Sequence, residues 1–300
     1  MKKNLDLSIV IVNYNTRALL EKCLLSVGRS GGLSDYEIFV VDNASTDGSS
    51  LMVEKRFPQV AIIKNSENLG FSKANNLAIS KTKGRYILLL NPDTLVEKNT
   101  LSEMISFMDR NPEAGVATCR VELPSGRLDR DCRRSFPTPW VSFTHFSHLS
   151  KIFPKSKIFG RYQMTYKNED KVEEIDSCVG AFMIVRSEAQ KEVGLLDENF
   201  FFYGEDLDWC FRFKEKGWKI LYNPKVKIIH YKGASSGMKK TSKDVTSATR
   251  EAKRKALVAS TEAMEVFYRK HYLKKYPKIV SFLIFGAVWC LRVLRLSRIN

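Results

Sequence analysis

The sequence lacks several patterns by which nucleotide-binding and metal-binding proteins are most readily recognised. No G-x-G-x-x-G follows the first apolar run and no G-x-x-x-x-G-K-[ST] occurs anywhere, so neither a dinucleotide-dependent oxidoreductase nor a P-loop NTPase is supported. The 6 cysteines include no C-x-x-C pair, which argues against a zinc ribbon or a disulfide scaffold and indicates a reducing compartment. The first apolar run, Leu7–Val12, is too short for the core of a signal peptide.

Acidic residues are scarce in the C-terminal part of the chain. Residues 211–300 carry 22 Lys+Arg against 5 Asp+Glu, whereas residues 1–210 carry 27 against 28, so the net charge of +16 is C-terminal. A basic tail can bind nucleic acid or an anionic membrane surface. The tail contains the apolar run Ile279–Leu291, which favours the membrane, and we expect no nucleic acid partner.

The apolar run in the tail predicts a helix that lies on a membrane. Its thirteen residues from Ile279 to Leu291 are fewer than the roughly 20 needed to span a bilayer, and basic residues flank it on both sides. We therefore expect an interfacial helix. The alternative is a helix docked on the rest of the chain or on a second copy in a homodimer.

Short apolar runs alternate with helical periods along residues 1–237. With 44% apolar residues, the chain has enough material for a substantial core. The alternation predicts an α/β fold with a doubly wound, mostly parallel sheet, followed by a basic, amphipathic helical extension. The predicted strands are Leu7–Val12, Tyr36–Val41, Val60–Ile63, Tyr86–Leu90, a strand around Gly180–Ala181, Trp218–Tyr222 and Val226–Tyr231. The first predicted helix follows Thr16 and ends at about Val27, and the second covers Phe71–Ser80. Another is predicted where Thr100–Glu103 fits a capping box.

Polar residues follow three of the predicted strands. They are Asn13-Tyr14-Asn15, Asp42-Asn43 and Asn91-Pro92-Asp93. In a sheet of this kind ligands bind outside the carboxyl ends of the strands. Asp42 can bond a nucleoside base or ribose there, and Tyr14 can stack on a base. Turn formation is the alternative reading, above all for Asn43 and Asp47.

Three further residues are candidates for a phosphate or metal site. Asp93 directly follows a buried strand, where a carboxylate can hold a cation that bridges two phosphates, although an isolated Asp more often starts a helix. Lys73, after the turn at Gly70, can reach a diphosphate or point into solvent. His230 lies at the end of the last predicted strand. It is either a metal ligand or an ordinary hydrogen-bonded histidine.

The stretch Gly204-Glu205-Asp206-Leu207-Asp208-Trp209 places three carboxylates between an aromatic run and a predicted helix. Asp206 and Trp209 share a helical face on which we expect a cleft, and Asp208 points elsewhere, toward solvent. Asp206 is the candidate general base. The alternative is that these carboxylates only stabilise the first turn of the helix through its dipole. Trp209 is either a platform for an acceptor sugar or packing beneath the site. Residues 122–174 are irregular, and we interpret them as a lid or an acceptor loop.

In their order, these pieces resemble inverting nucleotide-sugar glycosyltransferases of family 2 with a GT-A, Rossmann-like fold, and particularly the bacterial rhamnosyltransferase-like branch. The matching pieces are Val12–Thr16, Val41–Gly48, Asn68–Phe71, Leu90–Thr94, Gly180–Ala181, Gly204–Asp208 and His230. The resemblance implies a dTDP-rhamnose or UDP-hexose donor, a lipid-linked or surface-polysaccharide acceptor, and a cytoplasmic enzyme peripheral on the inner face of the cell membrane.

The resemblance also implies roles for individual residues. Asp206 would be the catalytic base, Asp93 and His230 would bind Mg²⁺ or Mn²⁺, and Asp42 would contact the nucleoside base. One departure is Asn91, which stands where the family commonly has the first aspartate of its DxD motif, so this site has lost a charge. The candidate substrate-binding residues are Asn13, Tyr14, Asp42, Asn68, Gly70, Lys73, Asn91, Gly180, Ala181, Glu205 and Trp209.

The implied organisation has three parts. Residues 1–115 would bind the nucleotide sugar, residues 116–237 the acceptor, and residues 238–300 would form the membrane-associating extension. The alternative function is a catalytically weak nucleotide-sugar-binding protein of the same fold within a polysaccharide assembly complex.

Overall fold

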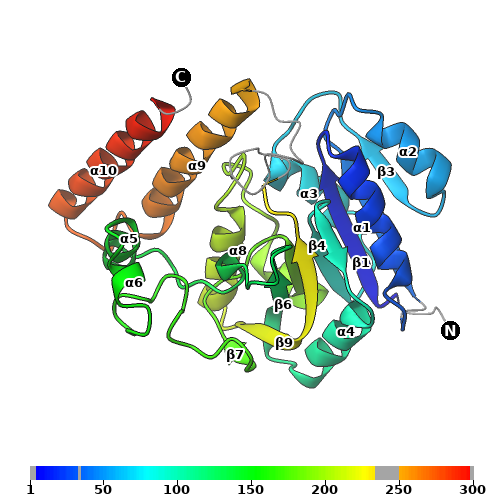
Figure 1. The fold of residues 1–300 in the computed structure, drawn as a ribbon, viewed down its shortest axis with the longest axis horizontal. Helices are drawn as coiled ribbons and strands as arrows, with labels where there is room; N and C mark the ends of the chain where they lie inside the picture. Colours follow the sequence, from blue (N-terminus) through cyan, green and yellow to red (C-terminus); the bar gives the residue numbers. More distant parts are fainter. Residues whose placement is uncertain (1–4, 33–34, 234–249, 298–300) are drawn as a thin grey trace.

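The computed structural model describes residues 5–32, 35–233 and 250–297. One mixed sheet runs through the molecule, with helices packed on it and a helical pair at one end (Figure 1). The strands are β1 (Leu7–Asn13), β2 (Tyr36–Asp42), β3 (Ala61–Lys64), β4 (Tyr86–Leu90), β5 (Thr94–Val96), β6 (Ala114–Glu122), β7 (Glu173–Glu174), β8 (Phe182–Arg186) and β9 (Lys219–His230). The helices are α1 (Arg17–Arg29), α2 (Ser49–Arg56), α3 (Phe71–Ile79), α4 (Thr100–Arg110), α5 (Pro139–Phe146), α6 (Leu149–Ile152), α7 (Ser187–Val193), α8 (Glu205–Glu215), α9 (Arg250–His271) and α10 (Lys278–Leu296), with a short 3-10 turn η1 (Arg130–Cys132).

The strand order is β3-β2-β1-β4-β8-β6-β9-β5, and β7 pairs with β9. Strands β1 to β4 are parallel to one another, as are β6 and β9, whereas β8 runs antiparallel between β4 and β6. The predicted mostly parallel sheet is therefore confirmed. Because β6 begins at Ala114, the predicted division after residue 115 falls inside a strand, and both predicted halves share one sheet.

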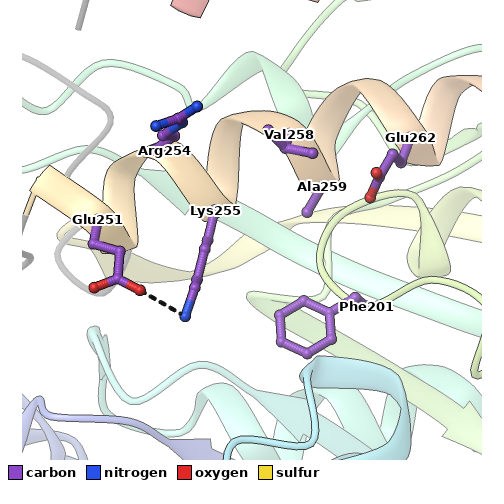
Figure 2. Close-up of a pocket in the computed structure, with 7 residues that line it drawn as sticks. All are labelled: Phe201, Glu251, Arg254, Lys255, Val258, Ala259 and Glu262. Carbon is purple, nitrogen blue, oxygen red and sulfur yellow. Dashed lines mark ion pairs between the residues drawn. The ribbon is translucent and has the colours of Figure 1, made fainter. Parts of the chain in front are cut away.

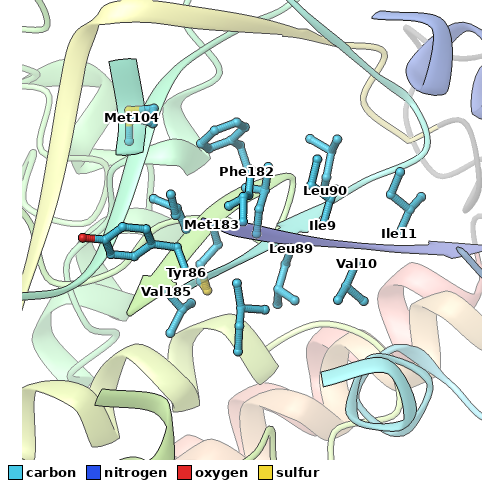
Figure 3. Close-up of a cluster of buried hydrophobic side chains, with 14 of the residues drawn as sticks. Ile9, Val10, Ile11, Tyr86, Leu89, Leu90, Met104, Phe182, Met183 and Val185 are labelled. Carbon is cyan, nitrogen blue, oxygen red and sulfur yellow. The ribbon is translucent and has the colours of Figure 1, made fainter. Parts of the chain in front are cut away.

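The central strands form because their residues are apolar on both faces. Ile9 and Ile11 of β1, Leu89 and Leu90 of β4, and Phe182 of β8 are all buried in one cluster (Figure 3). Burying such side chains stabilises the fold by about 1.5–3 kcal/mol each. This shared core holds β1, β2 and β4 in place relative to one another, so the loops that follow their carboxyl ends lie side by side.

Several local predictions need correction. Helix α4 begins at Thr100 but its N-cap is Asn99, which has a positive φ of 61°, and no side chain caps the helix, so the predicted capping box is absent. The Thr100 hydroxyl donates instead to the Lys227 carbonyl, 2.9 Å away. The two strands predicted between residues 218 and 231 are one strand, β9, because Pro224 interrupts the pattern without ending the pairing. The strands β5, β6 and β7 were not predicted.

Helices α9 and α10 form an antiparallel pair at the end of the molecule opposite α2 (Figure 1). Tyr268 and Ser281 share a hydrogen bond of 3.0 Å between the two helices, and Arg292 lies 2.8 Å from Glu265. One face of α10 thus docks on α9, which is the alternative setting predicted from the sequence, and the other face, with Phe282 75% exposed, is open. The membrane setting stays a prediction. With 19 residues and a mean hydropathy of 2.0, α10 also has the length and composition of a membrane-crossing helix, which the count of thirteen residues had argued against.

Candidate active site

The first part of the site lies where β1 and β2 end side by side. Asn13 and Asp42 are register partners, and the Asn13 amide donates to the Asp42 carboxylate over 3.2 Å. The Ser50 hydroxyl donates to the other oxygen of Asp42 over 2.5 Å. Asn13 and Asp42 are buried, whereas Tyr14, next to Asn13 in the chain, is 36% exposed. The pair therefore holds an oriented carboxylate beside a ring that is open to a ligand.

Asn43 organises the loop beside this carboxylate. Its amide donates to the Asn68 side chain and to the Gly70 carbonyl, and its oxygen accepts from the Leu69 backbone. The turn-forming interpretation of Asn43 is therefore the one that the contacts support. Asn68 and Gly70 are brought to the strand ends, and Lys73 is exposed on the first turn of α3.

Gly70 joins this loop to the segment that precedes α8. It has a φ of 80°, and a Cβ at this position would lie 2.5 Å from the Phe201 carbonyl oxygen. That same oxygen accepts from the Phe71 backbone over 2.7 Å. The glycine is needed for close approach of the two segments. It therefore brings the aromatic run before α8 against the end of the parallel strands.

Asn91, Gly180 and Ala181 meet where β4 ends and β8 begins. The Asn91 backbone N–H donates to the Ala181 carbonyl over 3.2 Å. A Cβ on Gly180 would touch the Phe71 ring at 3.5 Å, and the Ala181 side chain is fully buried. Gly180 and Ala181 thus permit close packing between α3, β4 and β8. The buried side chain of Ala181 cannot contact a ligand.

Asp93 and His230 are neighbours across the sheet edge, as the resemblance implied. The Asp93 carboxylate lies 3.3 Å from Nε2 of His230, and Nδ1 of His230 lies 3.3 Å from the Asp129 carboxylate. Both Asp93 and His230 are buried. Burial disfavours a charged ring, but the two carboxylates outweigh it and raise the pKa of His230 to about 9. Lys232 forms ion pairs with Asp129 and with Asp131.

The donor set fits a divalent cation that is shared with a substrate. Across residues 5–32, 35–233 and 250–297, no three His, Cys, Asp or Glu side chains are grouped so as to hold a metal ion by themselves. Asp93 and Nε2 of His230 would supply two ligands, and Mg²⁺ commonly takes its others from phosphates and water. Asp129 faces the second ring nitrogen, which is the arrangement that orients metal-bound histidines.

Asp206 lies in the first turn of α8 and is paired with a residue from the irregular segment. One carboxylate oxygen lies 2.6 Å from Nη2 of Arg134, and the other accepts from the Leu207 N–H over 2.7 Å. Arg134 also donates to the Cys178 carbonyl over 2.8 Å, just before Gly180. The ion pair therefore sits between α8 and the entry to β8. Sequence reasoning missed Arg134, whose only signal was a run of basic residues.

The two neighbouring carboxylates of Asp206 differ from each other. Glu205 is buried, and burial together with the charge of Asp206 raises the pKa of its carboxyl to about 8. Asp208 is fully buried and lies 2.8 Å from Arg212, Lys270 and His271. The expectation that Asp208 faces solvent is therefore wrong, because the basic end of α9 covers it.

Trp209 packs beneath the site. Its side chain is 0% exposed and its Nε1 donates to the Gly194 carbonyl over 2.9 Å. The acceptor-platform role needs an open ring face, so that expectation is wrong and packing is the role that the contacts support.

A hollow of about 400 Å³ opens between the loop before α8 and helix α9. Figure 2 shows Phe201 on one wall and the α9 side chains on the other, with Lys255 paired to Glu251 at 2.9 Å. The remaining lining residues are Arg254, Val258, Ala259 and Glu262. Because the Phe201 carbonyl binds Phe71, this hollow adjoins the strand-end residues.

Comparison with known proteins identifies the family of the chain. The family described as "Glycosyl transferase family 2" matches residues 8–193. An N-acetylglucosaminyl-diphospho-decaprenol L-rhamnosyltransferase of Mycobacterium tuberculosis is 25% identical over 242 residues, covering 77% of this chain and 78% of its own length. Rhamnosyltransferase WbbL of Escherichia coli is 28% identical over 235 residues, covering 74% and 82%.

The fold is also similar to that of solved structures. Mannosyltransferase PcManGT of Pyrobaculum calidifontis superposes with a TM-score of 0.57 at 15% identity, covering 89% of this chain and 65% of that one, so the chain spans less than two thirds of that structure. The GT-A-like fold is thereby confirmed. On the family match and its rhamnosyltransferase relatives, the chain belongs to glycosyltransferase family 2 and is a glycosyltransferase.

Proposed function

We propose that this glycosyltransferase moves a sugar from a nucleoside-diphosphate donor to a hydroxyl of a lipid-linked or surface-polysaccharide acceptor, with inversion at the anomeric carbon. dTDP-rhamnose is the preferred donor and a UDP-hexose the next. The relatives named as rhamnosyltransferases support this donor sugar. The observation that carries the proposal is the contact between Phe201 and Phe71, which brings the start of α8 to the ends of the parallel strands.

Asp206 acts as the general base. As the acceptor oxygen attacks the anomeric carbon, Asp206 takes its proton, the bond from that carbon to the phosphate breaks, and the nucleoside diphosphate leaves with the electron pair. Each carboxylate oxygen can accept more than one hydrogen bond, so the contacts to Arg134 and Leu207 leave a lone pair for the hydroxyl. A base in hydrogen-bond reach contributes about 10²–10⁴ in rate.

Arg134 acts as a positioning residue for that base. It fixes one oxygen of Asp206 while its second contact, to the Cys178 carbonyl, ties the pair to the start of β8. The alternative is that the ion pair between Arg134 and Asp206 only stabilises the fold. The two roles differ in their effect on turnover, because only a positioning residue lowers kcat when the stability of the fold is kept.

Asp42, Asn13 and Tyr14 bind the nucleoside. The Asp42 carboxylate is held by Asn13 and Ser50, so it can accept from a base N–H or a ribose hydroxyl, and the open ring of Tyr14 can stack on the base. Asn68, Gly70, Lys73, Asn91, Gly180 and Glu205 complete the candidate donor surface. Residues 1–115 would then carry most of the donor site and residues 116–237 the base and the acceptor side.

Asp93 and His230 would hold Mg²⁺ or Mn²⁺. When bound, the cation would stabilise charge on the leaving diphosphate. The mannosyltransferase of similar fold was crystallised with GDP-Man and Mn²⁺, which supports a divalent metal here. Asn91 in place of a carboxylate leaves the site with less negative charge to attract the cation.

The C-terminal pair would hold the enzyme on the inner face of the cell membrane. Helix α10 exposes apolar side chains along one face, while its other face packs on α9, which carries many charged residues. A helix docked along its length on a charged partner suits the membrane surface better than a span. This position would bring the site to lipid-linked acceptors.

A catalytically weak sugar-nucleotide-binding protein is the second candidate function. The observations that favour it are the ion pair on Asp206 and the missing carboxylate at Asn91. Such a protein would bind the nucleotide sugar without turnover.

A panel of nucleotide sugars with Mg²⁺ or Mn²⁺ tests the proposal by following the release of nucleoside diphosphate in the presence of membrane lipid extract. We expect release from one donor, with dTDP-rhamnose first. Binding of a donor without release from any would overturn the enzymatic mechanism in favour of the second candidate function.

A further inference from the structure

Residues 139–159, which contain α5 and α6, present an exposed aromatic surface at one end of the molecule (Figure 1). In α5 the side chains of Val141 and Thr144 are buried, whereas Trp140, Phe143 and Phe146 face outward. Phe143 is 57% exposed. A helix that hides a threonine and exposes three aromatic rings has its apolar face turned toward something outside the chain.

Three exposed rings, Trp140, Phe143 and Phe153, are joined into one patch by the half-buried ring of Phe159. Trp140 lies 5.8 Å from Phe143 and 6.3 Å from Phe159, and Phe159 lies 5.4 Å from Phe153, between ring centroids. Ile152 and Ile158 are exposed beside them. We refer to these residues together as the aromatic patch.

Basic residues surround the aromatic patch and acidic residues are missing from it. Residues 139–168 contain no Asp or Glu. Lys151, Lys155, Lys157 and Arg161 within this range are exposed. Long basic side chains beside exposed tryptophan and phenylalanine are typical of a surface that meets anionic lipid headgroups.

The aromatic patch lies at the same end of the molecule as the turn between α9 and α10 (Figure 1). Phe136, just before α5, contacts Phe211 at 4.8 Å between ring centroids. It packs against the same buried cluster as Tyr276, which precedes α10, and Phe285, which lies within α10. Figure 1 shows α5 and α6 beside the lower ends of α9 and α10. Two segments more than a hundred residues apart in sequence therefore expose apolar side chains at one end of the molecule.

We propose that the aromatic patch is a second membrane-binding surface, which inserts into the headgroup region of an anionic bilayer together with the open face of α10. The inference rests on the membrane association of α10 in the proposed function. A single helix can rotate on a membrane, whereas two separate contacts fix the orientation of the enzyme. Because Arg134 lies only a few residues before α5, the second contact is also connected directly to the partner of Asp206.

Tryptophan fluorescence of the full-length protein can report each contact separately. Trp209 is fully buried and Trp218 donates to Glu192, so Trp140 and Trp289 are the outward-facing reporters of the two surfaces. The probes are vesicles of equal parts phosphatidylglycerol and phosphatidylcholine, with bromine on the lipid chains as quencher, and neutral phosphatidylcholine vesicles. With Trp289→Phe, saturating anionic vesicles should quench the emission of Trp140, and the double variant with Trp140→Phe should lose that quenching.

Vesicle affinity gives a second readout. Replacing lysines of the segment, as in Lys151→Glu with Lys155→Glu, should weaken binding to anionic vesicles at least about fivefold per lysine. Phe143→Ser with Phe153→Ser should weaken it as well. Leu51→Ser is the matched control, since Leu51 is 54% exposed on α2 at the far end of the molecule and should leave affinity unchanged.

The outcomes separate this inference from the membrane association on which it rests. Quenching of Trp289 but not of Trp140 would overturn the second surface and leave α10 as the only contact. No binding of the unaltered protein to either vesicle would overturn both. If Phe143→Ser instead dissociated a dimer in the absence of lipid, the aromatic patch would be an interface between copies and the proposal would be wrong.

Discussion

Nη2 of Arg134 lies 2.6 Å from a carboxylate oxygen of Asp206, and both side chains are buried. The pair joins the irregular segment after β6 to the first turn of α8. A carboxylate buried against apolar rings would be costly if it were alone, and the guanidinium supplies the compensating charge. The candidate base is therefore held in place by a residue that also binds the start of β8.

Asp206→Asn should abolish sugar transfer and leave nucleotide binding near normal. The amide keeps the size of the side chain and can still accept from Arg134, but it cannot take a proton. The measurements are nucleoside diphosphate release and calorimetric binding of the donor nucleotide. A variant that retains more than about a tenth of the activity would remove Asp206 from this role, because a base contributes about 10²–10⁴.

Arg134→Gln should both destabilise the protein and lower turnover. Breaking a buried ion pair from one side costs about 3–5 kcal/mol, measured by urea unfolding. The variant keeps the carboxylate of Asp206 but loses the contact that orients it toward the acceptor hydroxyl. We therefore expect kcat to fall by a larger factor than the KM for the donor changes. If Arg134→Lys restored stability but not kcat, the positioning role would hold. If it restored both equally, the pair would be structural only.

The strand ends of the site could be predicted from sequence, whereas the pairs that complete it could not. Asn13 and Asp42 each end an apolar run, and parallel pairing makes them register partners, so their contact follows from local pattern. Arg134 and Asp206 are 72 residues apart, and Asp129 and His230 are 101 apart. Both partners come from residues 122–174, which have no hydrophobic period from which their position could be argued. Trp209 and Asp208 were misassigned because helical spacing gives the face of a side chain but not what covers it.

Glu205→Gln should make folding stability less dependent on pH. Burial and the charge of Asp206 raise the pKa of Glu205 from an ordinary value of 4.5 to about 8, so the folded state holds a proton that the unfolded state releases. This contribution to stability is fully present below about pH 4.5 and is lost as the pH rises toward 8. Glutamine mimics the protonated form at every pH.

The melting temperature measured across this range tests the prediction. Unaltered protein and the Glu205→Gln variant should melt alike near pH 4.5, and the variant should melt higher at pH 8. Glu198→Gln, at an exposed carboxylate that accepts from Asn76, is the control and should keep the pH dependence of the unaltered protein. Parallel curves for Glu205→Gln and the unaltered protein would show that Glu205 is charged in the folded state.

Asn91→Asp and Asp129→Asn should shift metal affinity in opposite directions. Aspartate at position 91 would restore a negative charge near Asp93 and tighten Mn²⁺ binding. Asp129 faces Nδ1 of His230, so replacing its carboxylate by a neutral amide would weaken the bond that orients the ring and lower metal affinity by about 10–100-fold. Electron paramagnetic resonance titration of free Mn²⁺ in the presence of nucleoside diphosphate measures both. Unchanged affinity in both variants would place the metal elsewhere.

Asp208→Asn should loosen helix α9 from the catalytic core. Asp208 is fully buried, with Arg212 from its own helix and Lys270 and His271 from α9 each 2.8 Å away. Burial opposes its charge, but the bonds from His271 and the nearby cations outweigh this and hold the pKa of Asp208 below its ordinary 3.8. The carboxylate therefore stabilises the fold above about pH 3.8, and this stabilisation is lost as the pH falls through the lower folded value.

At neutral pH the Asp208→Asn variant should lose about 3–5 kcal/mol in urea unfolding, because it removes the charge of a fully buried carboxylate on which Arg212, Lys270 and His271 converge. Amide hydrogen exchange should speed up in α9 more than in β1, since the lost contacts link α8 to α9. Asp170→Asn is the matched control: Asp170 pairs with Arg120 at an exposed position, and its loss should cost no more than about 1 kcal/mol. Equal exchange in α9 before and after the Asp208 change would mean that apolar packing around Phe267, and not the buried charge, holds the helical pair on the enzyme.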